Sequence, residues 1–151
     1  MSPASQGAGS GSGTNPTSAG RQVAASMSDQ DFVQKIARLS ENWGVRKGYG
    51  PAGSGSLQGT MKHGYAERLL NRYKRVTGQK PDLLAEQSYK NYTPTYRGNK
   101  GSARPDVFND KTGDIFDYKF TRNPNPQISP AQQARNRANV PGVTRQTAIH
   151  P

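Results

Sequence analysis

The 151-residue sequence predicts an α/β fold, and three observations support this prediction. Two segments, beginning at Ser28 and near Met61, carry apolar residues at the three- and four-residue spacing of an amphipathic helix. Residues 104–120 alternate apolar and polar side chains around a Gly-containing turn, which is typical of a β-hairpin. A third helix signal at Ser129-Pro130 precedes a final alternating segment, so helix and strand patterns are interleaved along the chain.

Residues 1–26 differ in composition from the rest of the chain. They are mainly Gly, Ser, Ala, Thr, Asn and Pro, with a single charge at Arg21. Such a segment cannot bury enough apolar area to offset the entropy lost when it becomes ordered. We therefore expect a disordered tail over residues 1–26.

The first helix is expected to begin after Ser28. Its side chain can cap the helix, and Asp31, three residues later, forms a variant of the capping box. The apolar stripe expected on this helix consists of Phe32, Val33, Ile36, Leu39 and Trp43. Residues 44–59 return to Gly, Ser and Pro. We therefore expect residues 27–59 to be an N-terminal helix plus a flexible linker, followed by a domain over residues 60–151.

A second helix is expected from Met61 to Thr77, because Gly78 suits a left-handed C-cap. Its buried stripe would consist of Ala66, Leu69, Leu70, Tyr73 and Val76. Glu67 lies on the edge of that stripe, at a helical angle about 60° from Leu70. Its carboxylate can therefore turn either to solvent or into a cleft beside the sheet. Residues 83–92 are expected to form the first strand.

The hairpin over residues 104–120 brings acidic and basic side chains together. In its second arm, Asp117 and Lys119 share one face with Ile115, and the aromatic residues at positions 116, 118 and 120 share the other. Asp106 enters from the first arm. Two carboxylates suit a hard divalent cation such as Mg²⁺, and an adjacent amine completes a site suited to phosphodiester hydrolysis. The alternative is an exposed hairpin in which Asp117 and Lys119 are a solvated pair.

A third helix is expected to begin at Ser129-Pro130, since serine caps a helix and proline fits its first turn. The helix is polar and should end before Pro141-Gly142. Residues 143–149 alternate and are expected to form the last strand.

The charge of the chain favours a polyanionic partner. Lysine and arginine number 21 against 10 acidic residues, giving a net charge of +11, and most of the excess lies after residue 60. Phosphate neutralisation by such residues supplies most non-specific affinity for nucleic acid. There is no cysteine, no apolar run long enough for a membrane span and no apolar secretory core. We expect a soluble chain without a signal peptide and without membrane insertion.

Pro105-Asp106, followed eleven positions later by Asp117-Tyr118-Lys119, resembles the PD-(D/E)XK signature of the restriction-endonuclease-like nuclease superfamily. The expected elements over residues 60–149 match the α-β-β-β-α-β core of that family. The resemblance implies a mixed central sheet flanked by helices, preceded here by the disordered tail and an extra N-terminal helix. It also implies a metal-dependent nuclease, with DNA favoured over RNA as the substrate. The basic surface, with little sign of base readout, indicates low sequence specificity. The alternative is a non-catalytic basic module that binds nucleic acid.

The resemblance also implies roles for particular residues. Asp106, Asp117 and Glu67, with the backbone carbonyl of Tyr118, would bind Mg²⁺ or Mn²⁺. Lys119 would orient or deprotonate the attacking water. A glutamine of the following helix often faces the site in this family, and Gln133 is the candidate here, with its neighbour Gln132 as the alternative. His63, one helical turn before Glu67, is expected to be a surface residue outside the site.

The arrangement of a small basic domain behind a Gly-, Ser- and Pro-rich segment also resembles the C-terminal nuclease domains of bacterial polymorphic toxins. This second resemblance implies an antibacterial effector that a secretion system delivers into the target-cell cytoplasm. It further implies a cognate acidic immunity protein that protects the producing cell.

Overall fold

The computed structural model describes residues 27–151, and the tail expected over residues 1–26 lies outside the described residues. The helices are α2 (Asp29–Arg46), α3 (Ser56–Thr77) and α4 (Pro130–Asn139). The strands are β1 (Leu83–Ala85), β2 (Ser88–Lys90), β3 (Thr93–Thr95), β4 (Val107–Asn109), β5 (Ile115–Tyr118) and β6 (Gln146–Ile149). Among these residues, no helix combines the length and the apolar run needed to cross a bilayer.

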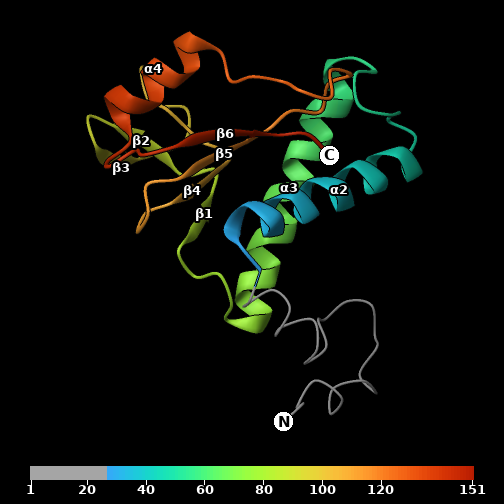
Figure 1. Ribbon diagram of the computed structural model, residues 1–151, viewed down its shortest axis with the longest axis horizontal. Helices are drawn as coiled ribbons and strands as arrows, with labels where there is room; N and C mark the ends of the chain where they lie inside the picture. Colours follow the sequence, from blue (N-terminus) through green and yellow to red (C-terminus); the bar gives the residue numbers. More distant parts are fainter. Residues whose placement is uncertain (1–26) are drawn as a thin grey trace.

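The main sheet has four strands in the order β1-β4-β5-β6. The β1–β4 and β4–β5 pairs are antiparallel, and the hairpin register places Val107 opposite Phe116. The last strand, β6, runs parallel to β5, and α4 lies in the connection between them. In Figure 1, α2 and α3 lie on one side of this mixed sheet and α4 on the other. The predicted α/β class is therefore confirmed.

The two faces of the sheet bury two hydrophobic clusters, and the predicted alternation in β5 assigns its side chains to them correctly. Phe116 and Tyr118 belong to the cluster under α2 and α3, together with the following residue of the same parity, Phe120. Ile115 belongs to the other cluster, with Phe108 of β4. Asp117, which shares the face of Ile115, therefore points toward the side of the sheet that carries α4.

The expected strand over residues 83–92 is interrupted. Only β1 joins the main sheet, while β2 pairs with β3 in a separate two-stranded sheet. The break lies at Glu86, whose φ of 56° is in the left-handed region. The backbone N–H of Glu86 donates a 3.0 Å hydrogen bond to the carbonyl of Asp106, which fixes this turn beside the start of β4.

The predicted helix caps are present. Ser28 Oγ accepts from the N–H of Asp31, and Ser129 Oγ accepts from the N–H of Gln132, each at 3.1 Å. Gly78 adopts the left-handed conformation that ends α3, at φ 71°. The helix begins at Ser56, five residues before the expected Met61.

Two residues expected on the buried helix stripes are exposed: Leu39 of α2 at 41% and Val76 of α3 at 38%. The face of α2 that packs inward instead carries Ala37, Ser40 and Gly44. Small side chains there let α3 approach closely. A Cβ atom on Gly44 would come within 2.5 Å of the Lys62 side chain of α3.

The segment between α2 and α3, expected to be a flexible linker, is held by a buried polar group. Lys62 is fully buried, and its Nζ lies 2.6 Å from Glu41 Oε1 and 2.8 Å from the carbonyl oxygen of Gly50. The other carboxylate oxygen of Glu41 accepts from the N–H of Ala52 at 2.9 Å. These contacts join the two helices, and α2 shares one hydrophobic core with residues that follow position 60.

Candidate functional site

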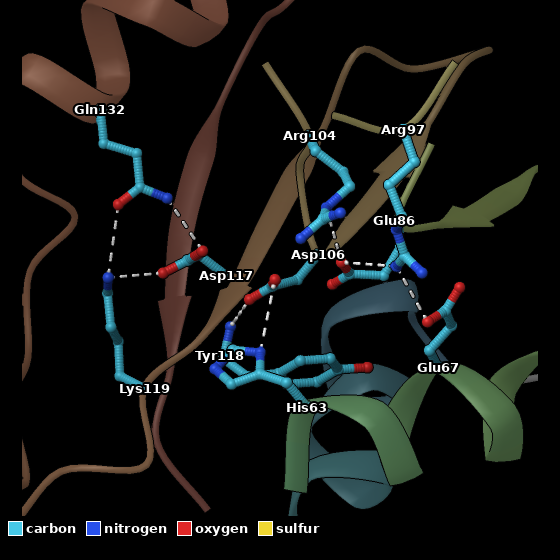
Figure 2. A network of polar contacts seen from close by, with 10 residues as sticks. All are labelled: His63, Glu67, Glu86, Arg97, Arg104, Asp106, Asp117, Tyr118, Lys119 and Gln132. Carbon is cyan, nitrogen blue, oxygen red and sulfur yellow. Dashed lines mark hydrogen bonds and ion pairs between the residues drawn. The ribbon is translucent and has the colours of Figure 1, made fainter. Parts of the chain in front are cut away.

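Polar side chains from α3, α4 and the sheet converge at one place (Figure 2). Asp106 directly precedes β4, and Asp117 lies in β5, with Lys119 just beyond its end. Helix α3 contributes His63 and helix α4 contributes Gln132. The site is therefore built on the hairpin that the sequence singled out, with a helix on each side.

Asp117 and Lys119 form an ion pair on the α4 side of the sheet. Lys119 Nζ lies 2.6 Å from Asp117 Oδ2, and the Asp117 side chain is only 8% exposed. Gln132 of α4 donates from Nε2 to Asp117 Oδ1 at 3.0 Å, and its Oε1 accepts from Lys119 Nζ at 3.4 Å. The pair is thus a buried, hydrogen-bonded arrangement, and the alternative of a solvated surface pair is wrong.

Asp106 is held from two sides. Its Oδ2 accepts a 2.7 Å hydrogen bond from the backbone N–H of Tyr118, and its Oδ1 lies 3.4 Å from Nδ1 of His63. The His63 ring stands edge-on to Phe120, with ring centroids 5.2 Å apart, which fixes its orientation toward the carboxylate. His63, expected at the surface, therefore belongs to this site.

Glu86 is the third carboxyl group of the site. Its side chain is 10% exposed, and its Oε1 lies 3.0 Å from Arg104 Nε and 3.3 Å from Arg97 Nη2. Arg97 also pairs with Glu67 at 3.1 Å. Glu67 therefore lines the same cleft as Glu86 and Asp106, at its edge and in contact with an arginine.

Burial and the proximity of these groups to one another shift their pKa values. Burial raises the pKa of Glu86 to about 8, and the hydrogen bond and negative charge of Asp106 add to this effect, which the Arg104 charge opposes. Burial also raises the pKa of Asp117 to about 6, aided by the Asp106 charge and opposed by Lys119. Near neutral pH and without a cation, Glu86 therefore tends to hold a proton, whereas Asp117 gains one only as the pH falls to about 6.

The pKa values of Asp106 and His63 shift in the direction opposite to the effect of burial. Burial alone would raise the pKa of Asp106, but the hydrogen bond and charge of His63, with hydrogen bonds from Glu86 and Asp117, lower it. Burial alone would lower the pKa of His63, but the Asp106 hydrogen bond and the charges of Asp106, Asp117 and Glu86 raise it. Asp106 is thus the carboxylate that remains ionised at the centre of the group.

Part of this cluster has the spacing of a metal site. One ligand atom each from His63, Glu86 and Asp106 lie within 4.8 Å of one another. The charge of Asp106 raises the pKa of Asp117, so a further carboxyl group lies close enough to interact with these three. Two or three carboxylate oxygens and one imidazole nitrogen are a donor set that a divalent cation can accept.

The sequence identified part of this arrangement. Asp106, Asp117 and Lys119 come together as expected, but Gln132 contacts them in place of the preferred candidate. The Gln133 side chain instead donates to the carbonyl of Ile128. Gln132, three residues after the Ser129 cap, is the glutamine that faces β5.

His63 and Glu86 were missed. The four-residue spacing from His63 to Glu67 does place both on one side of α3, and this was the available signal. Glu86 carried no such signal, because its position depends on the strand break. No protein-family model, no curated protein and no solved structure matches this chain.

Proposed function

We propose that the chain is a metal-dependent nuclease that hydrolyses phosphodiester bonds in nucleic acid, with DNA preferred over RNA and with low sequence specificity. The observation that carries the proposal is the convergence of Asp106, Asp117 and Glu86 with an amine, Lys119, that lies 2.6 Å from Asp117. Buried like charges are costly unless a cation or a reaction makes use of them.

The succession of elements supports the family resemblance. Helix α3 is followed by the three antiparallel strands β1, β4 and β5, then by α4 and the parallel strand β6. This is the α-β-β-β-α-β order of the restriction-endonuclease-like core, with the small β2–β3 sheet inserted after its first strand. Of the residues of the signature, Asp106 directly precedes the second strand of that order, Asp117 lies in the third, and Lys119 lies just beyond its end.

The donor set fits a divalent cation. Asp106 and Asp117 would hold Mg²⁺ or Mn²⁺, and Glu86 and His63 can complete the coordination. An imidazole ligand suits Mn²⁺ and other transition ions better than Mg²⁺, which favours oxygen ligands. We therefore expect Mn²⁺ to support activity at least as well as Mg²⁺. When bound, the cation would lower the pKa of a water molecule and neutralise charge on the scissile phosphate.

Lys119 would orient or deprotonate the attacking water and stabilise the negative charge that develops on the phosphate. Its amine already lies beside Asp117 and Gln132, so no rearrangement of the backbone is required. The backbone N–H of Tyr118 holds one oxygen of Asp106 and leaves the other free to face His63 or a cation.

The second candidate function is a nucleic-acid-binding module without catalysis. The net charge of +11 favours it equally, because a basic surface serves binding with or without hydrolysis. The two functions differ in their need for a metal. Binding should persist in EDTA, whereas cleavage should stop.

The test is to incubate the purified chain with plasmid, linear DNA and total RNA in Mg²⁺, Mn²⁺ or EDTA. Asp117→Asn and Lys119→Gln should abolish cleavage and leave binding largely intact. Asp110→Asn and Lys111→Gln, exposed residues in the turn of the same hairpin, are the matched controls and should cleave as the wild type does. Intact substrates in every metal would reject the nuclease and favour the binding module.

The proposed role as an antibacterial toxin rests on the sequence resemblance. Its test is expression inside bacterial cells, where the wild-type chain should arrest growth and Asp117→Asn should not. Equal growth with both chains would count against a toxin, whatever the activity of the purified protein. A toxin would also require the acidic immunity protein, which should bind the basic chain and prevent cleavage.

A further inference from the structure

A cleft with a volume of about 530 Å³ lies next to the candidate site, between α4 and the segment that leads into β4. It shares Arg104 with the Glu86 cluster and Gln132 with the Asp117–Lys119 pair, so it is continuous with both. Its lining contains two arginines and several hydroxyl and amide groups but no carboxylate. The cleft therefore has the opposite character to the acidic site beside it.

A buried hydroxyl lines this cleft without a partner. Ser88 of β2 is 2% exposed, and no group among residues 27–151 makes a hydrogen bond to its Oγ. A buried polar atom without a partner costs free energy, and such atoms are rare in folded proteins. The cost is recovered if a ligand in the cleft accepts a hydrogen bond from this hydroxyl.

The cleft also contains a guanidinium that is free to bind an anion. Arg97 and Arg104 pair with glutamates of the acidic site. Arg135 of α4 is exposed at the cleft, and within residues 27–151 no carboxylate lies within ion-pair distance of it. A guanidinium and a hydroxyl from residues that line the same cleft are donors suited to the oxygens of a phosphate.

We propose that this cleft is a phosphate-binding subsite. In it, Arg135 and Ser88 hold a phosphate that neighbours the scissile phosphate on the same nucleic-acid strand. The subsite rests on the proposed nuclease function for the identity of its ligand. Arg104, at the boundary between the cleft and Glu86, would contact the same strand as it passes toward Asp106. Phosphate contacts of this kind set position and contribute affinity without reading the base sequence.

The first test measures binding in EDTA, so that no cleavage occurs. Fluorescence anisotropy of a labelled oligonucleotide is recorded over a series of salt concentrations for the wild type, Arg135→Gln and Arg137→Gln. Arg137 is the matched control, because it is an exposed arginine of the same helix outside the cleft. Arg135→Gln should weaken binding several-fold and reduce the slope of log K against log salt by about 0.7 to 0.9. Equal affinities and slopes for the two variants would overturn the subsite.

The second test separates a ligand contact from a structural role. Ser88→Ala removes a hydroxyl that has no partner in the protein, so the melting temperature should stay unchanged or rise while oligonucleotide affinity falls about two-fold or more. A lower melting temperature with unchanged affinity would show that the hydroxyl serves the fold and would overturn its role in the subsite.

The subsite and the nuclease can fail independently. Weaker binding by Arg135→Gln in a protein that cleaves no substrate would support the subsite and reject the nuclease. Normal cleavage by the wild type with equal binding by Arg135→Gln and Arg137→Gln would support the nuclease and reject the subsite.

Discussion

The side-chain amide of Gln132 donates a 3.0 Å hydrogen bond to Oδ1 of Asp117. The other end of the same amide accepts from Lys119, so one glutamine of α4 fixes both the carboxylate and the amine of the site. The Ser129 cap places this residue at the first turn of the helix, where its orientation follows from the helix start. Gln132 is therefore a positioning residue for the groups on β5.

Replacing Gln132 by alanine should lower the cleavage rate about 10- to 100-fold, the range typical of residues that orient the ligands of a metal site. The pH profile should also change, because Gln132 holds Asp117 and Lys119 in contact. Gln133→Ala is the control, since its side chain reaches the carbonyl of Ile128 and not the site. Cleavage assays across pH 5 to 9 would decide. Similar rates in the two variants would contradict the role given to Gln132.

Glu86→Gln should reduce metal-dependent cleavage on the order of 100-fold, as expected when a main electrostatic contributor to catalysis is removed. Glu67→Gln should reduce it by no more than about 5-fold, because Glu67 pairs with the half-exposed Arg97 and such pairs contribute little. Metal titration of the rate distinguishes the two, since only Glu86→Gln should raise the metal concentration needed. Equal losses in both variants would instead support the ligand role that the sequence predicted for Glu67.

The sequence was most informative where a short-range pattern decides the structure. Alternation in the hairpin assigned Asp117 and Lys119 to one face because successive strand residues point to opposite sides of a sheet. Ser28 and Ser129 marked helix starts because their side chains bond to N–H groups three residues later. These features depend on neighbours within a few residues, which a single sequence contains.

The sequence did not predict the features that depend on contacts between residues far apart in the chain. Glu86 enters the site because the chain turns at a residue with φ 56°, a conformation that no local pattern around it announced. Lys62 lies in the core because Glu41, 21 residues earlier, supplies its counter-charge. The glycine-rich segment between them was expected to be a linker because composition does not show that its carbonyl and N–H groups bind this pair.

Glu41→Gln should lower the free energy of unfolding by about 3 to 5 kcal/mol, because it leaves the buried ammonium of Lys62 without a counter-charge. Asp114→Asn is the control. Asp114 has the same 19% exposure as Glu41, but its partner Arg145 is 68% exposed, so its loss should cost no more than about 1 kcal/mol. Urea unfolding measures both. Equal small losses would indicate that α2 and α3 are uncoupled.

Without metal, the protein should lose stability as the pH rises from about 4 to about 8. The pKa values of Asp117 and Glu86 are raised to about 6 and about 8 in the folded protein. Between their ordinary values and these, the folded state binds more protons than the unfolded state. The free energy of unfolding therefore falls with increasing pH across that window. The raised pKa of His63 acts in the same direction above its ordinary value of 6.5.

A divalent cation should reverse this trend, because it competes with protons for the same carboxylates. We expect the rise in melting temperature caused by Mn²⁺ or Mg²⁺ to be small at pH 5 and to grow through pH 6 to 8. Melting curves in EDTA and in each metal would measure it. Glu86→Gln should flatten the decline between pH 6 and 8 in EDTA and diminish the metal effect. Asp110→Asn, an exposed carboxyl of the hairpin turn, should follow the wild type. A metal effect that does not depend on pH would show that the ion binds elsewhere than at Asp117 and Glu86.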